Sequence, residues 1–407
     1  MNNPCEQSSL HSIGQAIDIL TTLLQRPLDS IRLPLTEARG KVLAADLAAR
    51  LDVPRWDNSA MDGYALNSAD PDPANPWLPV AGCQAAGDPP STLQPGHCMQ
   101  IFTGAVLPAG ADTVIPVENC RTNTGQVFFE NWQPGQNIRR QGEETRAGQP
   151  LLAQGTRLDA RHIGLLASQG YAEVPVYRPL RIGILSSGNE LRDPGTPLDD
   201  GQIYDTNSFL LTSLLQGWGF AVTCYPRMRD ELAAVSQQLA IAAGEQDVLI
   251  SSGGVSVGAA DHMKTAVQQH GQISLWRVAI QPGKPLAFGS IGKTPWIGLP
   301  GNPGASLVTA LVIARPALLA AQGQMDVAAK TLPVQATFTQ TRKRVREQYL
   351  HARLEACAHG LQARLHPKQS SAMLANCSWA DGMLIVPGHT SVSAGDTLQF
   401  VPFSSLL

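Results

Sequence analysis

The chain has 407 residues, of which 43% are hydrophobic and 15% are charged. This length is enough for two to four domains, and the low charged fraction excludes a chain kept disordered by charge. The 30 Lys and Arg residues against 33 Asp and Glu residues leave a net charge of -3. No overall basic field is therefore available to hold nucleic acid or an anionic membrane, and an anionic ligand must be bound by local groups.

The sequence indicates no secretory signal, no membrane span and no zinc site. The first 20 residues lack the basic and apolar segments of a secretory signal, and the longest apolar stretch, residues 307–321, is interrupted by Arg315 and Pro316. The seven cysteines are an odd number without a C-x-x-C pair, which is typical of reduced structural thiols. No histidine has zinc-site spacing. We therefore expect a cytoplasmic protein without zinc.

The first 180 residues have a mixed pattern. Apolar spacing predicts a helix over residues 13–24, ended by Pro27, and a second helical stretch beginning near Thr36. Residues 53–137 are rich in Pro, Gly and short β-like runs, and we expect strands at 112–117 and 127–129 with a turn at 123–125 between them. A helical pattern returns at 157–168, and Pro175 and Pro179 mark the next boundary.

Residues 181–320 alternate between strand and helix patterns. We expect strands at 181–185, 221–225, 247–251, 274–280 and 295–299, and helices at 206–217, 231–243, 260–270 and 305–314. This alternation is typical of parallel βαβ units with helices on both faces of the sheet. Beyond residue 333, alternating segments at 349–355, 361–365, 383–386 and 397–401 indicate a C-terminal β-domain.

The predicted fold class is multidomain α/β plus β. It consists of a central doubly wound α/β domain at 179–327, a small β-domain at 53–137, and a C-terminal β-domain at 328–407. A mixed helical N-terminal domain is expected from residues 1–52 together with 138–178.

Three glycine-containing loops are expected at one end of the α/β sheet. SSGNE at 186–190 follows the first strand, SSGGVSVG at 251–258 follows the third, and LPGNPG at 299–304 precedes the last helix. Ligands of open α/β sheets collect beyond the carboxyl ends of the strands, where glycines let the backbone approach an anion. The loops therefore predict one anion-binding crevice.

Other interpretations of these loops have less support from the sequence. Neither a dinucleotide fingerprint nor a P-loop is present. GVSVG at 254–258 does match the G-x-S-x-G elbow of serine hydrolases, which would make Ser256 a nucleophile. Against that alternative, the following helix begins too late and no oxyanion segment precedes the strand.

Charged residues at the same rim indicate the chemistry of the crevice. Glu190 lies inside the first loop, where a carboxylate beside anion sites is best explained as a ligand of Mg²⁺. Asp230 and Asp261 are either helix-capping acids or further members of the site. Lys284 projects from the turn QPGKP at 281–285, either toward an anion or into solvent.

The three loops belong to an ordered set of motifs along the chain, in which the first loop extends to SSGNEL at 186–191. The other motifs of the set are DNSAMDGYA at 57–65, FTGA at 102–105, NIRR at 137–140, YDTN at 204–207 and PGKP at 282–285. The set spans nearly the full chain and resembles the molybdopterin molybdenumtransferases, the MoeA family, which is related to the C-terminal part of gephyrin. The resemblance implies a four-domain homodimer whose α/β domain is similar to molybdopterin-adenylylating proteins.

The resemblance also implies a reaction. The enzyme would insert molybdate into adenylylated molybdopterin, cleave the adenylate with Mg²⁺ assistance, release AMP and give molybdenum cofactor. The active cleft would lie between the α/β domain and the small β-domain of the partner subunit. Transient contacts with the molybdopterin adenylyltransferase and with molybdoenzyme chaperones are also suggested, and no nucleic acid or membrane partner is expected.

The motifs carry the family's functional positions onto this chain. The implied catalytic residues are Asp62, Thr103, Glu144, Glu190, Asp230 and Asp261, with Glu190, Asp230 and Asp261 as the Mg²⁺ ligands. The implied substrate-binding residues are Arg139, Ser187, Gly188, Thr206, Ser252, Gly253, Gly254, Ser256, Arg277, Gln281, Lys284, Pro300, Gly301, Asn302, Pro303 and Ser371. Cations and amide donors suit a dianionic oxyanion and a phosphorylated pterin, while acids suit metal binding and the ordering of water.

Three positions depart from the family pattern. Glu144 and Asn189 each stand where Asp is common, and Gln281 stands where Lys is common. The change at Gln281 removes a positive charge from an anion site unless Arg277 or Arg139 supplies it. A divergent paralogue is therefore one alternative, and an enzyme that handles tungstate is another, because molybdate and tungstate have nearly the same size and charge. A non-catalytic molybdopterin carrier or scaffold is an alternative from another class.

Overall fold

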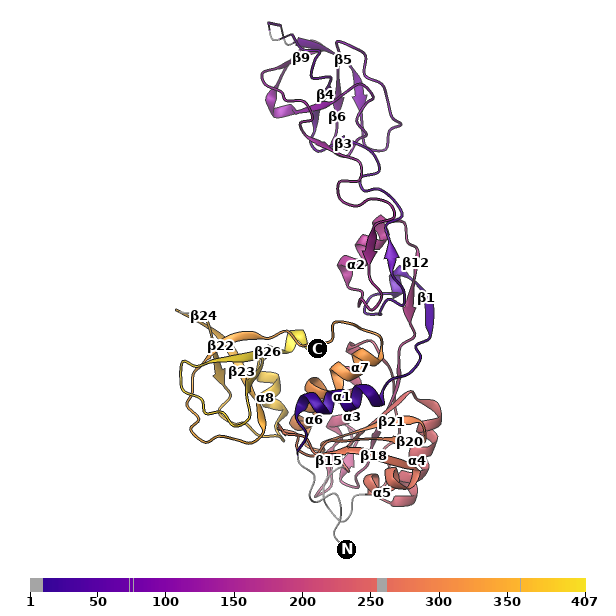
Figure 1. The fold of residues 1–407 in the computed structure, drawn as a ribbon, viewed down its shortest axis with the longest axis vertical. Helices are drawn as coiled ribbons and strands as arrows, with labels where there is room; N and C mark the ends of the chain where they lie inside the picture. Colours follow the sequence, from indigo (N-terminus) through magenta and orange to yellow (C-terminus); the bar gives the residue numbers. More distant parts are fainter. Residues whose placement is uncertain (1–9, 73, 76, 255–261, 359) are drawn as a thin grey trace. The chain divides into compact units, whose positions relative to one another are not determined.

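The computed structural model describes residues 10–72, 74–75, 77–254, 262–358 and 360–407. The chain divides into two compact units. Unit 1 comprises Met1–Ala44, Gly155–Asp159 and Glu173–Leu407, and unit 2 comprises Ala45–Gln154 and Ala160–Ala172. Figure 1 labels the helices and strands of both units.

Unit 2 is built around a six-stranded sheet with the strand order β7-β4-β6-β5-β9-β8. The strands are β4 (Gly63–Leu66), β5 (Trp77–Gln84), β6 (Cys98–Ile101), β7 (Thr113–Pro116), β8 (Cys120–Asn123) and β9 (Gln126–Phe129). A core of Tyr64, Leu66, Ile115 and Phe129 fills one face of this sheet. The unit also holds the helix α2 (Ala160–Ser168), the 3-10 turn η3 (Val117–Asn119), and two short strand pairs. These pairs are β2 (Leu47–Ala48) with β11 (Pro150–Leu152), and β3 (Asn58–Ser59) with β10 (Ile138–Arg139).

The prediction that residues 112–117 and 127–129 form a hairpin is wrong, although a strand forms in each segment. β7 pairs with β4, and the turn at Thr124 and Gly125 joins β8 to β9 instead. β8 has the sequence CRTN with three exposed residues, so it carries no apolar signal. Its pairing with β9 depends on backbone hydrogen bonds, which the hydrophobic pattern does not record.

The α/β sheet of unit 1 has the strand order β16-β13-β17-β21-β20-β18. Its strands are β13 (Arg181–Ser186), β16 (Ala221–Cys224), β17 (Val248–Ser252), β18 (Gly271–Trp276), β20 (Ala287–Ile291) and β21 (Thr294–Leu299). β16, β13, β17 and β21 are parallel, as predicted. At one edge, β20 pairs antiparallel with β21, and β18 pairs antiparallel with β20. The predicted strand at 274–280 is interrupted, because Arg277 has a positive φ of 81° between β18 and β19 (Ile280–Gln281).

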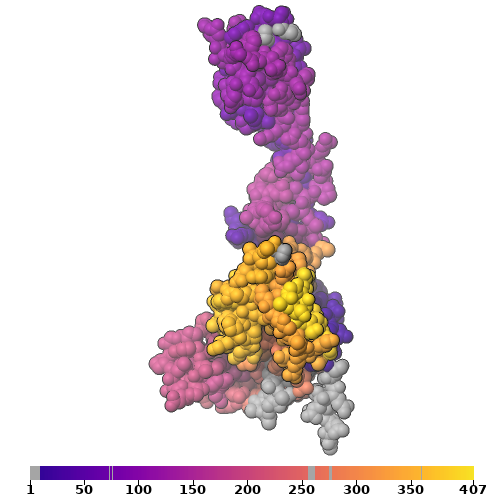
Figure 2. Space-filling view, turned by 90° about the vertical axis from the view of Figure 1, so that its left-hand side faces the viewer, coloured from indigo at the N-terminus to yellow at the C-terminus, as the bar shows by residue number. Residues whose placement is uncertain are grey.

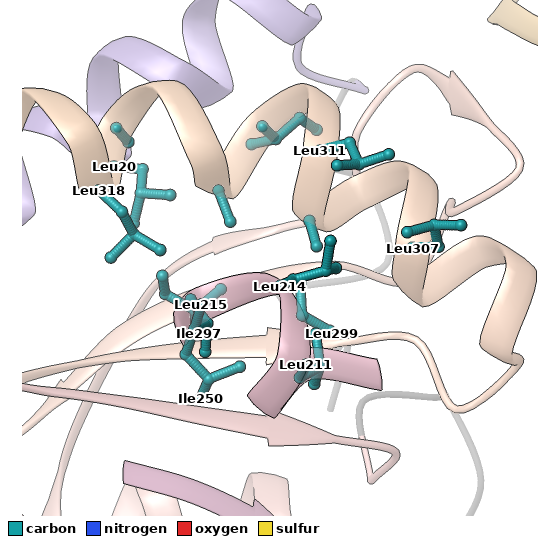
Figure 3. Close-up of a cluster of buried hydrophobic side chains, with 14 of the residues drawn as sticks. Leu20, Leu211, Leu214, Leu215, Ile250, Ile297, Leu299, Leu307, Leu311 and Leu318 are labelled. Carbon is teal, nitrogen blue, oxygen red and sulfur yellow. The ribbon is translucent and has the colours of Figure 1, made fainter. Parts of the chain in front are cut away.

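Helices cover both faces of this sheet, as predicted. One face packs against α1 (Ile13–Leu23), α3 (Thr206–Gly217), α6 (Pro303–Thr309) and α7 (Arg315–Ala321). Figure 3 shows how Leu20, Leu214 and Leu318 from these helices lie over Ile250 and Ile297 of the sheet. The other face packs against α4 (Leu232–Glu245) and α5 (His262–His270).

The helix that begins at Pro303 is longer than predicted. α6 continues through a π-helical turn (Ala310–Ala314) into α7, and Pro316 is tolerated in the first turn of α7. Pro303–Ala321 is the one stretch of the described chain long and apolar enough to cross a membrane, but 78% of its most apolar window is buried inside the protein. Arg315 is itself buried and donates to the carbonyl oxygens of Leu406, Val327 and Ser405.

β1 (Ser30–Pro34) pairs with β12 (Glu173–Tyr177). The helix predicted near Thr36 is wrong, because only the 3-10 turn η2 (Leu35–Glu37) forms there.

An ionic cluster joins the N-terminal segment of unit 1 to the α/β sheet. Asp247 contacts the guanidinium groups of Arg26, Arg178 and Arg181 at 2.8, 2.9 and 3.1 Å. Burial by itself would raise the pKa of Asp247, but hydrogen bonds led by those from Arg181 and Arg178 hold it well below its usual range.

The C-terminal strands close into a ring. β23 (Glu347–Cys357), β24 (Gly360–Leu365), β22 (Leu332–Ala336), β26 (Thr397–Pro402) and β25 (Gly382–Val386) pair in this order, and β25 pairs back with β23. The result is a small barrel, to which α8 (Leu374–Trp379) and the 3-10 turn η5 (Phe403–Ser405) are added. Its residues, orange to yellow, form one lobe in Figure 2. β19 pairs with β23, so the strand that follows Arg277 joins the barrel.

Candidate active site

The first cavity lies at the carboxyl ends of β13 and β17 and has a volume of about 290 Å³. We call it the Glu190 cavity. Its lining comprises Ser186, Ser187, Glu190, Leu191, Ile203, Tyr204, Asp205, Thr206, Asn207, Ser252, Gly253, Gly301 and Pro303. Seven of the predicted site residues are therefore brought together by the three loops and the start of α3, namely Ser187, Glu190, Thr206, Ser252, Gly253, Gly301 and Pro303.

The carboxylate of Glu190 lies over Gly188. Gly188 has a φ of 152°, and a Cβ atom at this position would lie 2.7 Å from one carboxylate oxygen of Glu190. The loop is held by a hydrogen bond from the Ile203 amide, at the start of β15 (Ile203–Tyr204), to the Glu190 carbonyl at 2.8 Å. β15 pairs with β14 (Leu191–Arg192), so a short ribbon supports the loop. The Glu190 side chain remains exposed at the rim.

Asn207 belongs to the YDTN motif and lines the Glu190 cavity, although it is not among the predicted site residues. Its Nδ2 donates to Ser252 Oγ at 2.6 Å and to the Gly301 carbonyl at 2.8 Å, which ties α3 to the other two loops. Its Oδ1 is buried and has no hydrogen-bond partner among the described residues. A buried acceptor of this kind normally has a partner, so Asn207 is a candidate ligand-binding group. The neighbouring Asp205 caps α3 and is satisfied by Ser186 and Ser208.

The second cavity lies between the α/β sheet and the C-terminal barrel and has a volume of about 560 Å³. We call it the Lys284 cavity. Predicted site residues in its lining are Gln281, Lys284, Pro300, Asn302 and Ser371. Arg344 and Arg346 also line it, whereas the described lining contains no Asp or Glu. Its charged side chains are therefore all cationic at neutral pH.

One loop separates the two cavities. Pro300 and Asn302 line the Lys284 cavity, while Gly301 and Pro303 line the Glu190 cavity. Ser371 holds this loop from the barrel side, because its carbonyl accepts the Ala305 amide at 3.0 Å and its hydroxyl lies 3.3 Å from Asn302 Nδ2. The Glu190 cavity, with an acid at its rim, and the Lys284 cavity, lined by cations, therefore lie on either side of residues 300–303.

Some predicted residues of unit 1 lie outside both linings. Arg277 lines neither cavity, and its amide donates to the Leu286 carbonyl. The Asp230 amide donates to Asn189 Oδ1 in the first loop at 3.3 Å. Gly188 and Gly254 are likewise not lining residues. Ser256 and Asp261 lie outside the described residues.

Unit 2 contains the four remaining predicted residues. Asp62 Oδ1 accepts hydrogen bonds from the Thr103 amide at 2.7 Å and from the Thr103 hydroxyl at 2.8 Å. These two bonds hold the pKa of the Asp62 carboxyl below its ordinary value. Arg139 in β10 and Glu144 are exposed. Asp62 and Thr103 are therefore a fixed pair at the surface of the unit.

Comparisons with known proteins cover nearly the whole chain. Residues 11–170 match the model of the MoeA N-terminal region (domain I and II), residues 183–320 match the probable molybdopterin binding domain, and residues 333–403 match the MoeA C-terminal region (domain IV). A molybdopterin molybdenumtransferase of Haemophilus influenzae is 40% identical over 77% of this chain and 78% of its own length. The chain belongs to the MoeA family.

Other MoeA relatives extend the match. Molybdopterin molybdenumtransferase 2 of Mycobacterium tuberculosis is 37% identical over 92% of this chain and 96% of its own length. The crystal structure of a molybdopterin biosynthesis MoeA protein from Pyrococcus horikoshii superimposes with a TM-score of 0.78 at 28% identity, covering 97% of this chain and 99% of that chain. The multidomain α/β plus β fold is thus that of MoeA, and the family is one of transferase enzymes.

Proposed function

We propose that this chain inserts molybdate into adenylylated molybdopterin, with Mg²⁺-assisted cleavage of the adenylate and release of AMP, to give molybdenum cofactor. The names of its MoeA relatives support a molybdopterin molybdenumtransferase. The observation that carries the finer proposal is the adjacency of the two cavities across residues 300–303. Insertion of an oxyanion into a phosphorylated organic ligand needs a cationic subsite beside one that places a metal or a water.

The Glu190 cavity is suited to a hard cation. Mg²⁺ prefers oxygen ligands and usually keeps several waters, using one or two carboxylates together with phosphate oxygens. The Glu190 carboxylate and the unpaired Oδ1 of Asn207 are such donors. When bound, Mg²⁺ would offset the negative charge that develops on phosphate oxygens.

In this proposal, residues of the two cavities act on different substrates. Glu190 can accept a proton from water at the adenylate phosphorus, and the glycines at 253 and 301 let the backbone approach the pterin phosphate. Lys284 and the hydroxyl of Ser371 can donate to the oxygens of molybdate in the Lys284 cavity. Attack of this water on the adenylate phosphorus would break the phosphoanhydride P–O bond and free AMP. The two dithiolene thiols would bind molybdenum as thiolates, while one oxide of molybdate leaves as water with the two thiol protons.

We extend the proposal to a homodimer that works in the cytoplasm. Asp62 and Thr103 belong to unit 2, and both cavities belong to unit 1. Unit 2 of the partner subunit would complete the site, as the resemblance implies. In the part of the chain that the structure describes, the long apolar helix Pro303–Ala321 is largely buried, which supports a location away from the membrane.

The test is release of AMP from adenylylated molybdopterin. The full chain is incubated with this substrate, Mg²⁺ and either molybdate or tungstate, and AMP and the metal-loaded pterin are both measured. We expect AMP release that requires molybdate and Mg²⁺. Tight pterin binding without AMP release would instead favour a carrier, and equal rates with both oxyanions would favour an enzyme that also handles tungstate.

A further inference from the structure

Arg192 lies two residues after Glu190, and its side chain turns back along the loop that carries Glu190. Its Nη1 atom donates to the Asn189 carbonyl oxygen at 2.9 Å and to the Leu191 carbonyl oxygen at 2.6 Å. The Glu190 carbonyl oxygen, between these two in the chain, accepts the Ile203 amide at 2.8 Å. Three successive carbonyl groups centred on Glu190 are therefore held by hydrogen bonds, and one guanidinium nitrogen supplies two of these bonds.

The backbone of Arg192 is itself joined to the start of α3. β14 pairs with β15 in parallel, and the Arg192 carbonyl oxygen accepts the Asp205 amide at 2.8 Å. Asp205 is buried, and its carboxylate accepts hydrogen bonds from the Ser186 and Ser208 hydroxyls at 3.0 and 2.7 Å. The Arg192 guanidinium therefore connects the backbone around Glu190 to the capped N-terminus of a core helix.

The contacts of Arg192 are with the loop backbone. A hydrogen bond from a charged donor is roughly twice as strong as one between neutral groups. Arg192 is half-buried, so water competes less for its donors than at a fully exposed arginine. It is not a lining residue of the Glu190 cavity, although the adjacent Leu191 is. Arg192 is thus placed to act on the loop and not on a ligand.

The position of the Glu190 carboxylate depends on this backbone. The side chain is exposed, so packing in the core does not fix its direction, and its Cα–Cβ bond follows the backbone of residues 189–191. Catalytic groups need to be held within about 0.5 Å of their productive position, and a displacement of about 1 Å can lower a rate by roughly 100-fold. Loss of the two hydrogen bonds beside Glu190 would therefore affect catalysis through the place of its carboxylate.

We propose that Arg192 is a positioning residue for Glu190, which holds the backbone on both sides of Glu190 so that the carboxylate stays at the rim of its cavity. The inference rests on the proposed function for the role of Glu190, and it adds a residue outside the predicted site residues and their motifs. Because Arg192 does not line the cavity, its loss should lower the rate of the chemical step and leave substrate binding nearly unchanged.

The first test is AMP release by Arg192→Ala, measured against the concentration of adenylylated molybdopterin with molybdate and Mg²⁺ present. We expect kcat to fall by about 10- to 100-fold, while KM stays within about twofold of wild type. Guanidinium ion at a non-denaturing concentration should restore part of kcat, because it can donate to the carbonyl oxygens that the lost side chain served. It should restore no activity to Glu190→Ala.

Asp193→Asn is the matched control. Asp193 follows Arg192 in the chain, is exposed, and lies 3.7 Å from Arg227 Nη1. The change removes a charge from the same segment but leaves the two hydrogen bonds beside Glu190 in place. It should keep kcat within about twofold of wild type, because an exposed ion pair contributes little.

Hydrogen exchange gives a readout that needs no turnover. In Arg192→Ala, the Leu191 and Ile203 amides should exchange faster than in wild type, because they donate to the Gly188 and Glu190 carbonyl oxygens of the loop. Amides of the buried strand β17 should exchange at the wild-type rate, which separates a local change from loss of the fold. If Arg192→Ala does not fold, Arg192→Gln takes its place. Its amide keeps neutral N–H donors, so its kcat should fall by about 3- to 10-fold.

A loss of kcat that guanidinium partly restores, together with faster exchange of the loop amides, supports the assignment. Wild-type kcat in a folded Arg192→Ala protein overturns it. A loss that guanidinium does not restore, with loop amides exchanging at the wild-type rate, overturns it as well. If the wild-type chain releases no AMP, the proposed reaction fails. Faster loop exchange in Arg192→Ala then still supports the hold of Arg192 on the loop, and unchanged exchange overturns it.

Discussion

Glu190 is an exposed residue at the rim of its cavity. Its carboxylate lies over Gly188, and it has no packing role in the core of unit 1. We expect Glu190→Ala to leave the melting temperature within about 2 °C of wild type, because exposed substitutions usually change stability by less than about 0.5 kcal/mol. The same variant should abolish cofactor synthesis, measured by reconstitution of a molybdoenzyme apoprotein.

Asp200→Ala is the matched control for that experiment. Asp200 is exposed in the segment between β14 and β15 and does not line either cavity. It should retain wild-type activity. Full activity in a folded Glu190→Ala protein would remove Glu190 from the mechanism.

His351 makes stability depend on pH in the acid range. Its pKa is lowered from 6.5 to about 4 by burial, so the unfolded chain takes up a proton at a higher pH than the native chain does. Its contribution is therefore fully present above pH 6.5 and is lost as the pH falls toward 4, by about 3 kcal/mol in total.

The measurement is urea unfolding of wild type and His351→Leu at pH 7 and pH 4. The variant should lose less stability than wild type between these two pH values, whatever its stability at pH 7. An equal loss in both proteins would mean that His351 does not titrate as its burial implies.

At the scale of elements, the approach of α6 to the barrel depends on Gly304. A Cβ atom at Gly304 would lie 2.8 Å from the Ser371 carbonyl oxygen, and that oxygen accepts the Ala305 amide. Gly304→Ala must therefore displace the segment at Ser371, at a cost of about 1 to 3 kcal/mol for overpacking. Because Ser371 lines the Lys284 cavity, we also expect weaker molybdate binding.

Gly244→Ala gives the comparison within another helix. Gly244 lies in α4 and a Cβ atom there meets no atom within 4 Å. This change should be neutral or stabilise by up to about 1 kcal/mol, because alanine favours helix. The free energy of unfolding in urea and the affinity for molybdate are measured for both variants. Equal values in the two variants would show that the close contact between position 304 and Ser371 does not limit the side chain at that position.

Several elements were predictable from local pattern. The helices α1 and α3 agree with the sequence to within a residue, because apolar periodicity is reinforced by caps at Ser12 and Asp205. The parallel strands β13, β17 and β21 are buried throughout or nearly so, and their apolar runs indicated them. β8 and β20 were missed, since one is polar and exposed and the other follows a proline-rich turn.

At the scale of the whole molecule, the proposed site needs residues from both units. Asp62 lies in unit 2 and Glu190 in unit 1, and the proposal assigns them to different subunits of a dimer. Mixing inactive Asp62→Ala with inactive Glu190→Ala chains should restore activity, because a heterodimer can contain one intact site. The measurement is AMP release after subunit exchange has been verified by mass spectrometry.

Each variant alone, taken through the same exchange procedure, is the control for that mixture. Both should stay inactive. Absence of recovery in a mixture that contains verified heterodimers would contradict a site shared between subunits.

The sequence by itself determined the family, the strand and helix alternation of the α/β domain, and the loops at 186–190 and 299–304. These features are local, because glycines, prolines and apolar periodicity act within a few residues of chain. Tertiary structure decided which loop residues face the Glu190 cavity and which face the Lys284 cavity. It also brought Arg346 beside Ile280, across 66 residues of chain, and left Arg277 outside both linings. Such placements depend on strand pairing and domain packing between distant segments, and no short window of sequence records them.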